Sequence, residues 1–369
     1  GDVYKRQGSQ EGVEPATPKV SVILPARNEE KYISKCLDTL LNQDYPNFEI
    51  IAINDSSTDR TGEIMQRYAA KDRRIVYIEA EVKPQGWAGK TWACYQGYLK
   101  ATGDLFLFTD ADTEHSGKSM SMAVAQMEKL KLDALTAVPR LLCNDFWTNI
   151  TLPQLATFLH TRFSPLRVND PNAKTGYFFG SFFLMTRKAY ESVGTHMGVR
   201  QELVEDGALG GKVKSGKFNM KMFRGEKQVT AVWARDLNTL WHGLRRLMIP
   251  LYHQSKTGAI LTAVATFFLL FEPFMALGYS TWLYESVGGL LADIMLAINL
   301  ATVALIFCTT AVQCRLGLFE NPLYAFGSPI SGGLIAFGFF VAIAGAKRKD
   351  AVSWRDRTYT VGERQHPIH

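Results

Sequence analysis

A long apolar stretch near the C-terminal end constrains this chain more than any other feature. Residues 257–346 contain only five charged side chains, Glu272, Glu285, Asp293, Arg315 and Glu320. Three segments within it, at about 258–283, 287–313 and 323–346, are each long enough to cross roughly 30 Å of hydrocarbon at about 1.5 Å per residue. The stretch excludes a purely soluble protein, and the ordinary composition of the preceding residues excludes a disordered one.

The side of the membrane on which the chain ends is left open by the sequence. Three crossings would place the C-terminal tail opposite the N-terminal domain, whereas the basic residues from Lys347 onward favour the cytoplasmic side. We expect either a re-entrant segment, with Glu272-Pro273 as the break, or an exception to the charge rule. The broad prediction is a multi-pass protein of the cell membrane whose polar domain faces the cytoplasm.

The charge distribution divides the chain into five parts. The formal net charge of +6 lies mainly on the polar part, which suits anionic lipid and an anionic substrate, and we expect no nucleic-acid partner. Residues 235–256 have an apolar side and a cationic side, which predicts an interfacial helix, with a helix packed on the soluble domain as the alternative. The expected parts are a disordered or cloning-derived tail at 1–18, an α/β domain at 19–234, the interfacial amphipathic helix at 235–256, a transmembrane region of about three helices at 257–346, and a basic tail at 347–369.

Short apolar runs alternate with amphipathic segments in the first part of the polar domain. The runs are rich in Val, Ile and Phe, as expected of strands buried on both faces of a parallel sheet, and lie at 20–24, 49–53, 74–78, 104–109 and 134–138. This alternation predicts a doubly wound, mostly parallel, Rossmann-like α/β sheet. Residues 177–185 are a further expected strand, and 203–215 an expected helix. Ligands of such sheets bind at the carboxyl ends of the strands.

Asp110 and Asp112 come directly after the fourth apolar run. Two carboxylates separated by one residue at a strand end can converge on one divalent cation. Mg²⁺ or Mn²⁺ prefers such oxygen ligands and keeps positions open for phosphate oxygens. The alternative is a solvated turn, in which D-x-D triplets also occur.

The first two strands also end in polar residues. Asp55 follows the second run and can accept hydrogen bonds from a ribose hydroxyl or a base N–H, although turn chemistry would also explain it. Pro25, Arg27 and Glu29 follow the first run at the same sheet edge. Arg27 is expected to meet a phosphate or base, or to form a surface ion pair.

Two later segments complete the candidate site. Lys90 ends the sequence Gly-Trp-Ala-Gly-Lys at the start of a helix, where backbone N–H groups and a lysine suit an anionic diphosphate. Glu205 and Asp206 open another helix. They are either ordinary partners of the helix dipole or a catalytic pair in which Asp206 is the general base for an acceptor hydroxyl.

These pieces together resemble family 2 glycosyltransferases of the GT-A fold, over residues 20 to about 246. Residues 20–30 are similar to that family's opening strand and loop, and Ile-Asn-Asp-Ser-Ser-Thr-Asp matches its DDxSxD element with Asn54 in place of the first Asp. Phe-Thr-Asp-Ala-Asp-Thr matches the DxD element, and Glu205-Asp206 matches the ED element. The resemblance implies nucleoside contact at Asp55, metal and diphosphate at Asp110 and Asp112, and the base at Asp206.

A narrower likeness is to membrane glycosyltransferases, including enzymes associated with carotenoid and hopanoid gene clusters. It rests on residues 86–93, 194–206 and 354–359, although Gly-Thr-His stands where the subgroup tends to have Gly-Gly-His. The Q-x-x-R-W motif of processive and ceramide-type members is absent from the sequence. Arg245 and Arg246 lie in that region, and either could meet the diphosphate or a lipid head group.

The expected function is an inverting, metal-dependent glycosyltransferase. It would use Mg²⁺ or Mn²⁺ to move a sugar from a nucleotide-sugar, with UDP as the favoured nucleotide, to a hydroxyl of a membrane lipid. The acceptor side is assigned to His196, Gly180 and Ser181, with a satisfied loop histidine and core phenylalanines as the alternatives. Rival functions are a polyprenyl-phosphate sugar synthase, a processive polysaccharide synthase and a non-catalytic nucleotide-binding membrane anchor.

Overall fold

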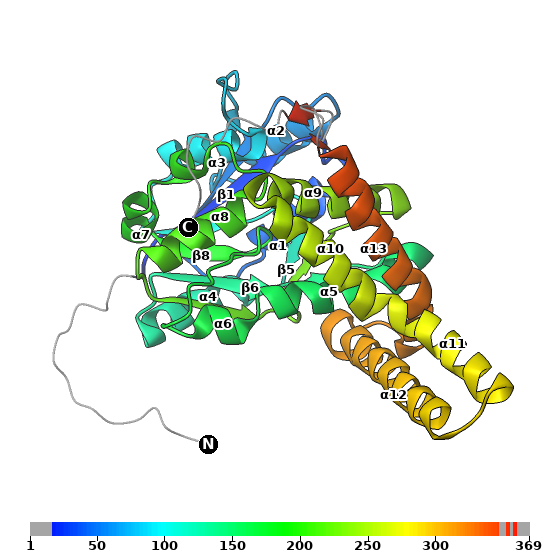
Figure 1. Ribbon diagram of the computed structural model, residues 1–369. Coiled ribbons are helices and arrows are strands. Elements are labelled where there is room, and N and C mark those ends of the chain that lie inside the picture. The colour runs from blue at the N-terminus through cyan, green and yellow to red at the C-terminus, as the bar shows by residue number, and fades with distance from the viewer. Residues whose placement is uncertain (1–16, 347–351, 355–356, 360–369) are drawn as a thin grey trace, which may run out of the picture.

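The computed structural model describes residues 17–346, 352–354 and 357–359 (Figure 1). The tail expected at residues 1–18 and the basic tail expected at 347–369 lie largely outside the described residues. A two-stranded ribbon, β11 (Val352–Trp354) and β12 (Arg357–Tyr359), is the described part of the second tail.

A seven-stranded sheet forms the centre of the polar domain, in the order β3-β2-β1-β4-β8-β6-β9. β1 pairs in parallel with β2 and β4, whereas β8 runs antiparallel to both β4 and β6, so the sheet is mostly parallel as predicted. The strands are β1 (Val20–Ala26), β2 (Phe48–Asn54), β3 (Ile75–Glu79), β4 (Leu105–Phe108), β6 (Ala134–Val138), β8 (Phe183–Thr186) and β9 (Met220–Arg224).

The strand expected at 177–185 is wrong for its first half. Only Phe183–Thr186 joins the sheet as β8, because the preceding backbone turns at Gly180 and Ser181. That turn brings Gly180 against Asp206, as described below. A smaller sheet of β5 (Thr113–His115), β10 (Val229–Ala231) and β7 (Arg140–Leu141) lies beside the main one.

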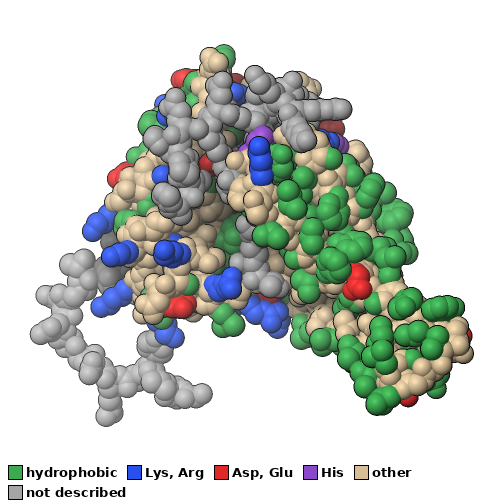
Figure 2. Space-filling model, viewed as in Figure 1, with side chains coloured by type: hydrophobic (Ala, Val, Ile, Leu, Met, Phe, Trp, Pro, Cys, Tyr) green, Lys and Arg blue, Asp and Glu red, His purple; other side chains and the backbone are tan. Residues whose placement is uncertain are grey.

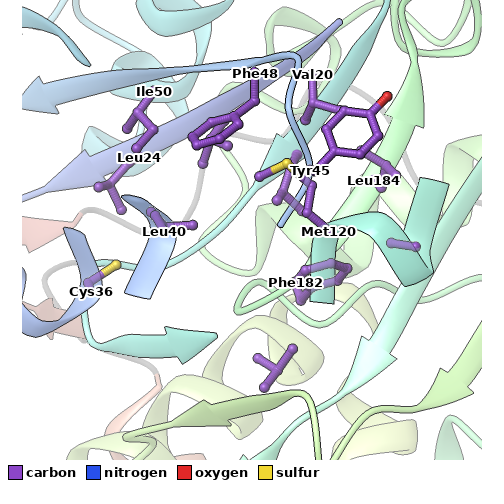
Figure 3. Packing of buried hydrophobic residues seen from close by; sticks show 14 of the residues in the cluster. Val20, Leu24, Cys36, Leu40, Tyr45, Phe48, Ile50, Met120, Phe182 and Leu184 are labelled. Carbon is purple, nitrogen blue, oxygen red and sulfur yellow. The ribbon is translucent and has the colours of Figure 1, made fainter. Parts of the chain in front are cut away.

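Helices cover both faces of the main sheet. One face packs on α1 (Ile33–Leu41), α2 (Thr61–Lys71) and α4 (Ser119–Leu130), and Figure 3 shows part of this core. The other face packs on α3 (Gly89–Lys100), α7 (Arg187–Ser192) and α8 (Glu205–Ser215), with the short α6 (Pro165–Asn169) and the 3₁₀ turn η1 (His196–Val199) nearby. Successive residues of β1 alternate between the two cores: Val22 and Leu24 face the first, and Ile23 faces the second.

Four further helices form a layer beside this domain. They are α5 (Phe146–Arg162), α9 (Leu237–Gln254), α10 (Lys256–Leu270) and α13 (Ser328–Gly345). Leu244 and Met248 of α9 are buried in one core with Ala263 of α10 and Phe339 of α13. The apolar side of α9 is therefore covered by other helices of the chain, and its position at a membrane surface stays a prediction.

The apolar stretch contains two helical segments long and apolar enough to cross a membrane, Leu290–Leu318 and Pro322–Gly345. The first joins α12 (Leu290–Val312) to the π-helical turn η2 (Gln313–Leu318), and the second joins the 3₁₀ turn η3 (Pro322–Gly327) to α13. α10 and α11 (Glu272–Ser286) form a bent pair, with 45° between them, that would make a third span. The bend falls directly before Glu272-Pro273, the expected break, and hydrophobic side chains gather over these helices in Figure 2.

Close contact between α10 and α13 depends on a glycine. A Cβ atom on Gly332 would lie 2.0 Å from the carbonyl oxygen of Leu270, whereas a Cβ on Gly278 of α11 would meet nothing within 4 Å. We expect Gly332→Ala to lower the free energy of unfolding by about 1–3 kcal/mol, the usual cost of overpacking. Thermal denaturation in one detergent measures this, with Gly278→Ala as the matched control. Equal melting temperatures for the two variants would contradict the packing described.

Candidate active site

The loops after β1 and β2 are tied together at the carboxyl edge of the sheet. Nη1 of Arg27 donates hydrogen bonds to the carbonyl oxygens of Asp55 and Ser56, each over 2.7 Å. The backbone N–H of Asp55 donates to the carbonyl oxygen of Ala26 over 2.8 Å, and Asp55 is 5% exposed. Arg27 therefore holds the loop that carries Asp55. Pro25 lies within β1 and is paired in register with the second strand.

Asn54 has a structural reason to be an amide. Its Nδ2 donates to both carboxylate oxygens of Glu79, over 3.0 and 2.9 Å, and its Oδ1 accepts from the backbone N–H of Ser57 over 3.2 Å. An aspartate here would accept from Ser57 but would place a like charge against Glu79. Asn54 replaces the first Asp of the DDxSxD element, and this replacement suits the Glu79 carboxylate at the end of β3, which needs a donor.

Lys90 joins the elements that the sequence suggested separately. It lies in the first turn of α3, and its Nζ is 2.6 Å from Oδ1 of Asp110 and 2.7 Å from Oε1 of Glu205. Burial lowers the pKa of Lys90, but the charges of Asp110, Glu205 and Asp206 hold it well above its ordinary value. The lysine is therefore a fixed cation between the DxD and ED elements.

Asp206 lies at the same cluster. Its Oδ1 accepts a hydrogen bond from the backbone N–H of Gly207 over 2.8 Å. Burial and the negative charge of Glu205 raise the pKa of Asp206 to about 7, although Lys90 acts in the opposite direction. A carboxylate with such a pKa can take up a proton near neutral pH.

Gly180 closes this cluster from the β8 side. A Cβ atom at Gly180 would lie 2.8 Å from Oδ2 of Asp206, 3.0 Å from Nζ of Lys90 and 3.2 Å from Oδ2 of Asp110. The backbone at this point therefore approaches all three side chains closely. Ser181 follows, is 5% exposed, and accepts a hydrogen bond from Oγ1 of Thr109 at its carbonyl oxygen.

His196 lies in the interior of the domain. It is 1% exposed, its Nδ1 is 2.7 Å from the hydroxyl of Tyr190, and its ring centroid lies 4.9 Å from that of Phe108. Burial lowers the pKa of His196 to about 3, so the ring is neutral at physiological pH. This geometry matches the satisfied loop histidine and gives no support to acceptor binding. The neighbouring Phe178, Phe182 and Phe183 are likewise core residues.

Arg235 is a site residue that the sequence reasoning assigned only to the cationic side of the next helix. Its Nη2 lies 2.8 Å from Oε2 of Glu29 and 3.9 Å from Oδ2 of Asp112, and its guanidinium lies over the ring of Tyr32 at 4.5 Å. Glu29 was expected at the nucleotide edge, and Arg235 connects it there to the DxD element. No local motif signals this contact, because its partners are 206 positions apart in the sequence.

The two arginines of α9 have different surroundings. Burial and the negative charge of Asp206 raise the pKa of Tyr177. The positive charge of Arg246 lowers it. Tyr177 borders the ED element, since a Cβ on Gly207 would lie 2.8 Å from its ring. Nη2 of Arg245 instead lies 3.7 Å from the Cβ position of Gly345, at the end of α13. Arg246 thus acts on a residue beside the ED element, whereas Arg245 has a neighbour at the end of α13.

The donor set of the DxD element fits a divalent cation that is also bound by substrate. Among the residues that the structure describes, no group of three or more His, Cys, Asp or Glu side chains could hold a metal by itself. Mg²⁺, however, is usually bound by one or two carboxylates together with substrate phosphates and water. Asp110 and Asp112 supply two such carboxylates at the end of β4.

The pairing of Asn54 with Glu79 can be tested by charge. Asn54→Asp should destabilise the protein by about 1.5–3 kcal/mol, because a lost hydrogen bond to a charged group costs roughly that much. Chemical denaturation measures the change, and the double variant Asn54→Asp/Glu79→Gln should recover most of it. A single variant as stable as the wild type would show that the contact contributes nothing.

Comparisons with known proteins point to one family. The family model described as glycosyl transferase family 2 matches residues 21–194. The 4,4'-diaponeurosporenoate glycosyltransferase of Staphylococcus aureus (strain bovine RF122 / ET3-1) is 26% identical over 366 residues, which cover 94% of this chain and 89% of that protein. Glycosyltransferase GlyA of Streptococcus pneumoniae serotype 4 is 42% identical over 94 residues, which cover 26% of this chain and only 13% of GlyA.

A solved structure shares the fold. The mannosyltransferase PcManGT from Pyrobaculum calidifontis, in complex with GDP-Man and Mn²⁺, has a TM-score of 0.52 and 21% identity, with 86% of this chain and 88% of that chain covered. At this identity the likeness concerns the fold alone. Together with the family match, it leads to one conclusion: residues 21–194 of this chain are a glycosyl transferase family 2 region, and they lie in a GT-A domain that is followed by a C-terminal membrane region.

Proposed function

We propose that this protein transfers a sugar, with inversion, from a nucleotide-sugar to a hydroxyl of a lipid in the membrane, and that the donor is a UDP-sugar. The contact of Lys90 with both Asp110 and Glu205 carries this proposal. It joins a candidate diphosphate site to a candidate general base at the carboxyl ends of the strands, where α/β sheets bind their ligands.

The donor would extend along this edge of the sheet. Asp55 would contact the nucleoside, and the loop held by Arg27 keeps that carboxylate in place. The ends of β2 and β4 are separated by β1, so roughly 10 Å lies between the nucleoside end and the DxD element. Lys90 and the N-terminus of α3 would bind the diphosphate through charge and backbone N–H groups.

Asp110 and Asp112 would hold Mg²⁺ or Mn²⁺. A divalent cation there would neutralise negative charge on the departing diphosphate. The chain's own residues prepare this site: Arg235 fixes Asp112 and Glu29 from the start of α9, and Lys90 fixes Asp110.

Asp206 would act as the base. The acceptor oxygen forms a bond to the anomeric carbon on the face opposite the nucleotide, the bond to the diphosphate oxygen breaks, and the hydroxyl proton passes to the Asp206 carboxylate. A pKa of about 7 suits a base that works near neutral pH. Glu205 supports this role, because its negative charge contributes to the raised pKa of Asp206. The ion pair with Lys90 holds Glu205 in place.

An anionic lipid is the second candidate acceptor. The relatives in Staphylococcus aureus are named for 4,4'-diaponeurosporenoate, a carotenoid carboxylate, and the charge of Arg246 acts on the ED side of the site. A carboxylate or phosphate oxygen is already a nucleophile, so Asp206 would not need to remove a proton. The two acceptor classes therefore differ in what Asp206 must do.

The pH dependence distinguishes these acceptors. For a hydroxyl acceptor, kcat/KM should rise with pH through about 7, because the raised pKa leaves Asp206 protonated and inactive below that value. Asp206→Asn should then lose about 10²- to 10⁴-fold in kcat. The assay uses purified protein, UDP-sugars, Mn²⁺ and a lipid extract, with Asp44→Asn, an exposed acidic residue, as the control. Full activity in Asp206→Asn would instead indicate an anionic acceptor.

Gly180 offers a test of the cluster itself. Gly180→Ala would press a methyl group against Asp206, Lys90 and Asp110, so we expect at least about a 10-fold loss of activity with little change in melting temperature. Gly211→Ala on α8, where a Cβ would meet nothing within 4 Å, is the matched control. Wild-type activity in the Gly180 variant would show that this approach of the backbone has no part in the reaction.

A further inference from the structure

The last membrane helix ends beside the GT-A domain. α10 and α13 run antiparallel, because Gly332 near the start of α13 lies against Leu270 at the end of α10. Further along α13, Gly338 lies against Leu244 of α9, and Gly345 lies near Arg245. α9 itself follows directly on Arg235, which contacts the DxD element. The end of α13 is thus on the domain's side of the helical layer, as Figure 1 also shows.

α11 and α12 form a hairpin that extends away from this layer. Gly288 and Gly289 have positive φ angles of 69° and 91° and make the turn between the two helices. The helices contact each other along their length, with the rings of Phe274 and Phe307 at 5.7 Å. Only 11% of the most apolar part of α12 is buried, against 44% for α13, and the hairpin projects from the body of the molecule in Figure 1.

The returning end of the hairpin is fastened to the GT-A domain. Nε of Arg140 donates to the carbonyl oxygen of Leu318 over 2.7 Å, and its Nη2 lies 3.3 Å from Oε1 of Glu320. Nη2 of Arg224, at the end of β9, donates to the carbonyl oxygen of Leu316 over 3.3 Å. These bonds satisfy carbonyl groups in the last turn of the helix, which would otherwise lack partners.

The acidic residues of the apolar stretch lie at both ends of this hairpin, with Glu272 and Glu320 at its base, whereas the basic residues lie only toward the domain. Glu285 and Asp293 flank the Gly288–Gly289 turn. Lys256 begins α10 and Arg315 lies in η2, and both are toward the domain. In the sequence, Lys347, Arg348 and Lys349 directly follow Ala346, the C-cap residue of α13. Basic residues toward the domain match the distribution of Lys and Arg that sets orientation in cytoplasmic membranes, to which Asp and Glu contribute little.

We propose that the α11–α12 hairpin is the element inserted into the hydrocarbon of a lipid bilayer, and that the chain enters and leaves the bilayer on the same side. Residues Leu290–Leu318 would extend about 42 Å, more than the roughly 30 Å of the hydrocarbon core. α11 alone would extend only about 22 Å, so the crossing that enters the bilayer also uses the end of α10, with which α11 forms the bent pair. α10 and α13 lie against the domain with their apolar outer sides in the lipid. The end of α13 then shares the cytoplasmic side with the domain, which removes the conflict between three spans and a basic tail.

Protease protection in sealed membrane vesicles tests this arrangement without reference to activity. One form of the full chain carries a cleavable tag before Gly1, a second carries it after His369, and a third carries it between Gly288 and Gly289. We expect the first two tags to be cleaved from one face of the membrane and the third from the opposite face. Detergent-solubilised samples, in which all three tags should be cleaved, are the control.

Two results would overturn the proposal. Cleavage of the two terminal tags from opposite faces would show an odd number of crossings. Cleavage of the tag at the Gly288–Gly289 turn from the same face as the terminal tags would show that the hairpin does not enter the bilayer as proposed. Neither result depends on the donor or acceptor, so the proposed sugar transfer would stand or fall separately.

Discussion

The ammonium group of Lys90 is the contact on which the site depends. Asp110 follows β4, whereas Glu205 and Asp206 begin α8, and their negative charges would repel one another without a cation between them. Lys90 can hold this position because α3 packs on β1, β2 and η1, and because the backbone N–H of Ala88 donates to the carbonyl oxygen of Arg200 in the loop that precedes the ED element. Gly180 then fits against the assembled cluster, since any larger residue would collide with it. The site therefore depends on the packing of four chain segments: the start of α3, the end of β4, the turn at Gly180 and the start of α8.

A second set of contacts links the site to the membrane region. Arg235 stands between the last strands of the GT-A domain and α9, and it connects Asp112 and Glu29 to the helix whose apolar side packs on α10 and α13. Arg140 and Arg224 fasten the returning end of the α11–α12 hairpin to the domain. Under the proposed function, these contacts would let a lipid acceptor in the bilayer and a nucleotide-sugar in water reach one site without a movement of whole domains.

Much of the fold could be predicted from the sequence, because its signals are local. Buried strands such as Ala134–Val138 appear as short apolar runs, and the break before Glu272-Pro273 follows from proline chemistry. The turn at Gly180 was mistaken for strand, because its reason is the distant carboxylate of Asp206. The role of Arg235 at the site was missed for the same reason, since its partners are far away in sequence. For His196, no local pattern indicates that its polar ring is buried against Phe108.

The central claim is that the carboxylate cluster around Lys90 performs sugar transfer to a lipid. The most direct measurement is mass spectrometry of lipids from cells that express either the wild type or Lys90→Met in equal amounts. Loss of the ammonium removes the ionic partner that Asp110 and Glu205 share. The account predicts a lipid carrying an added sugar in wild-type cells and its loss in the variant. Identical lipids in the two strains would contradict it.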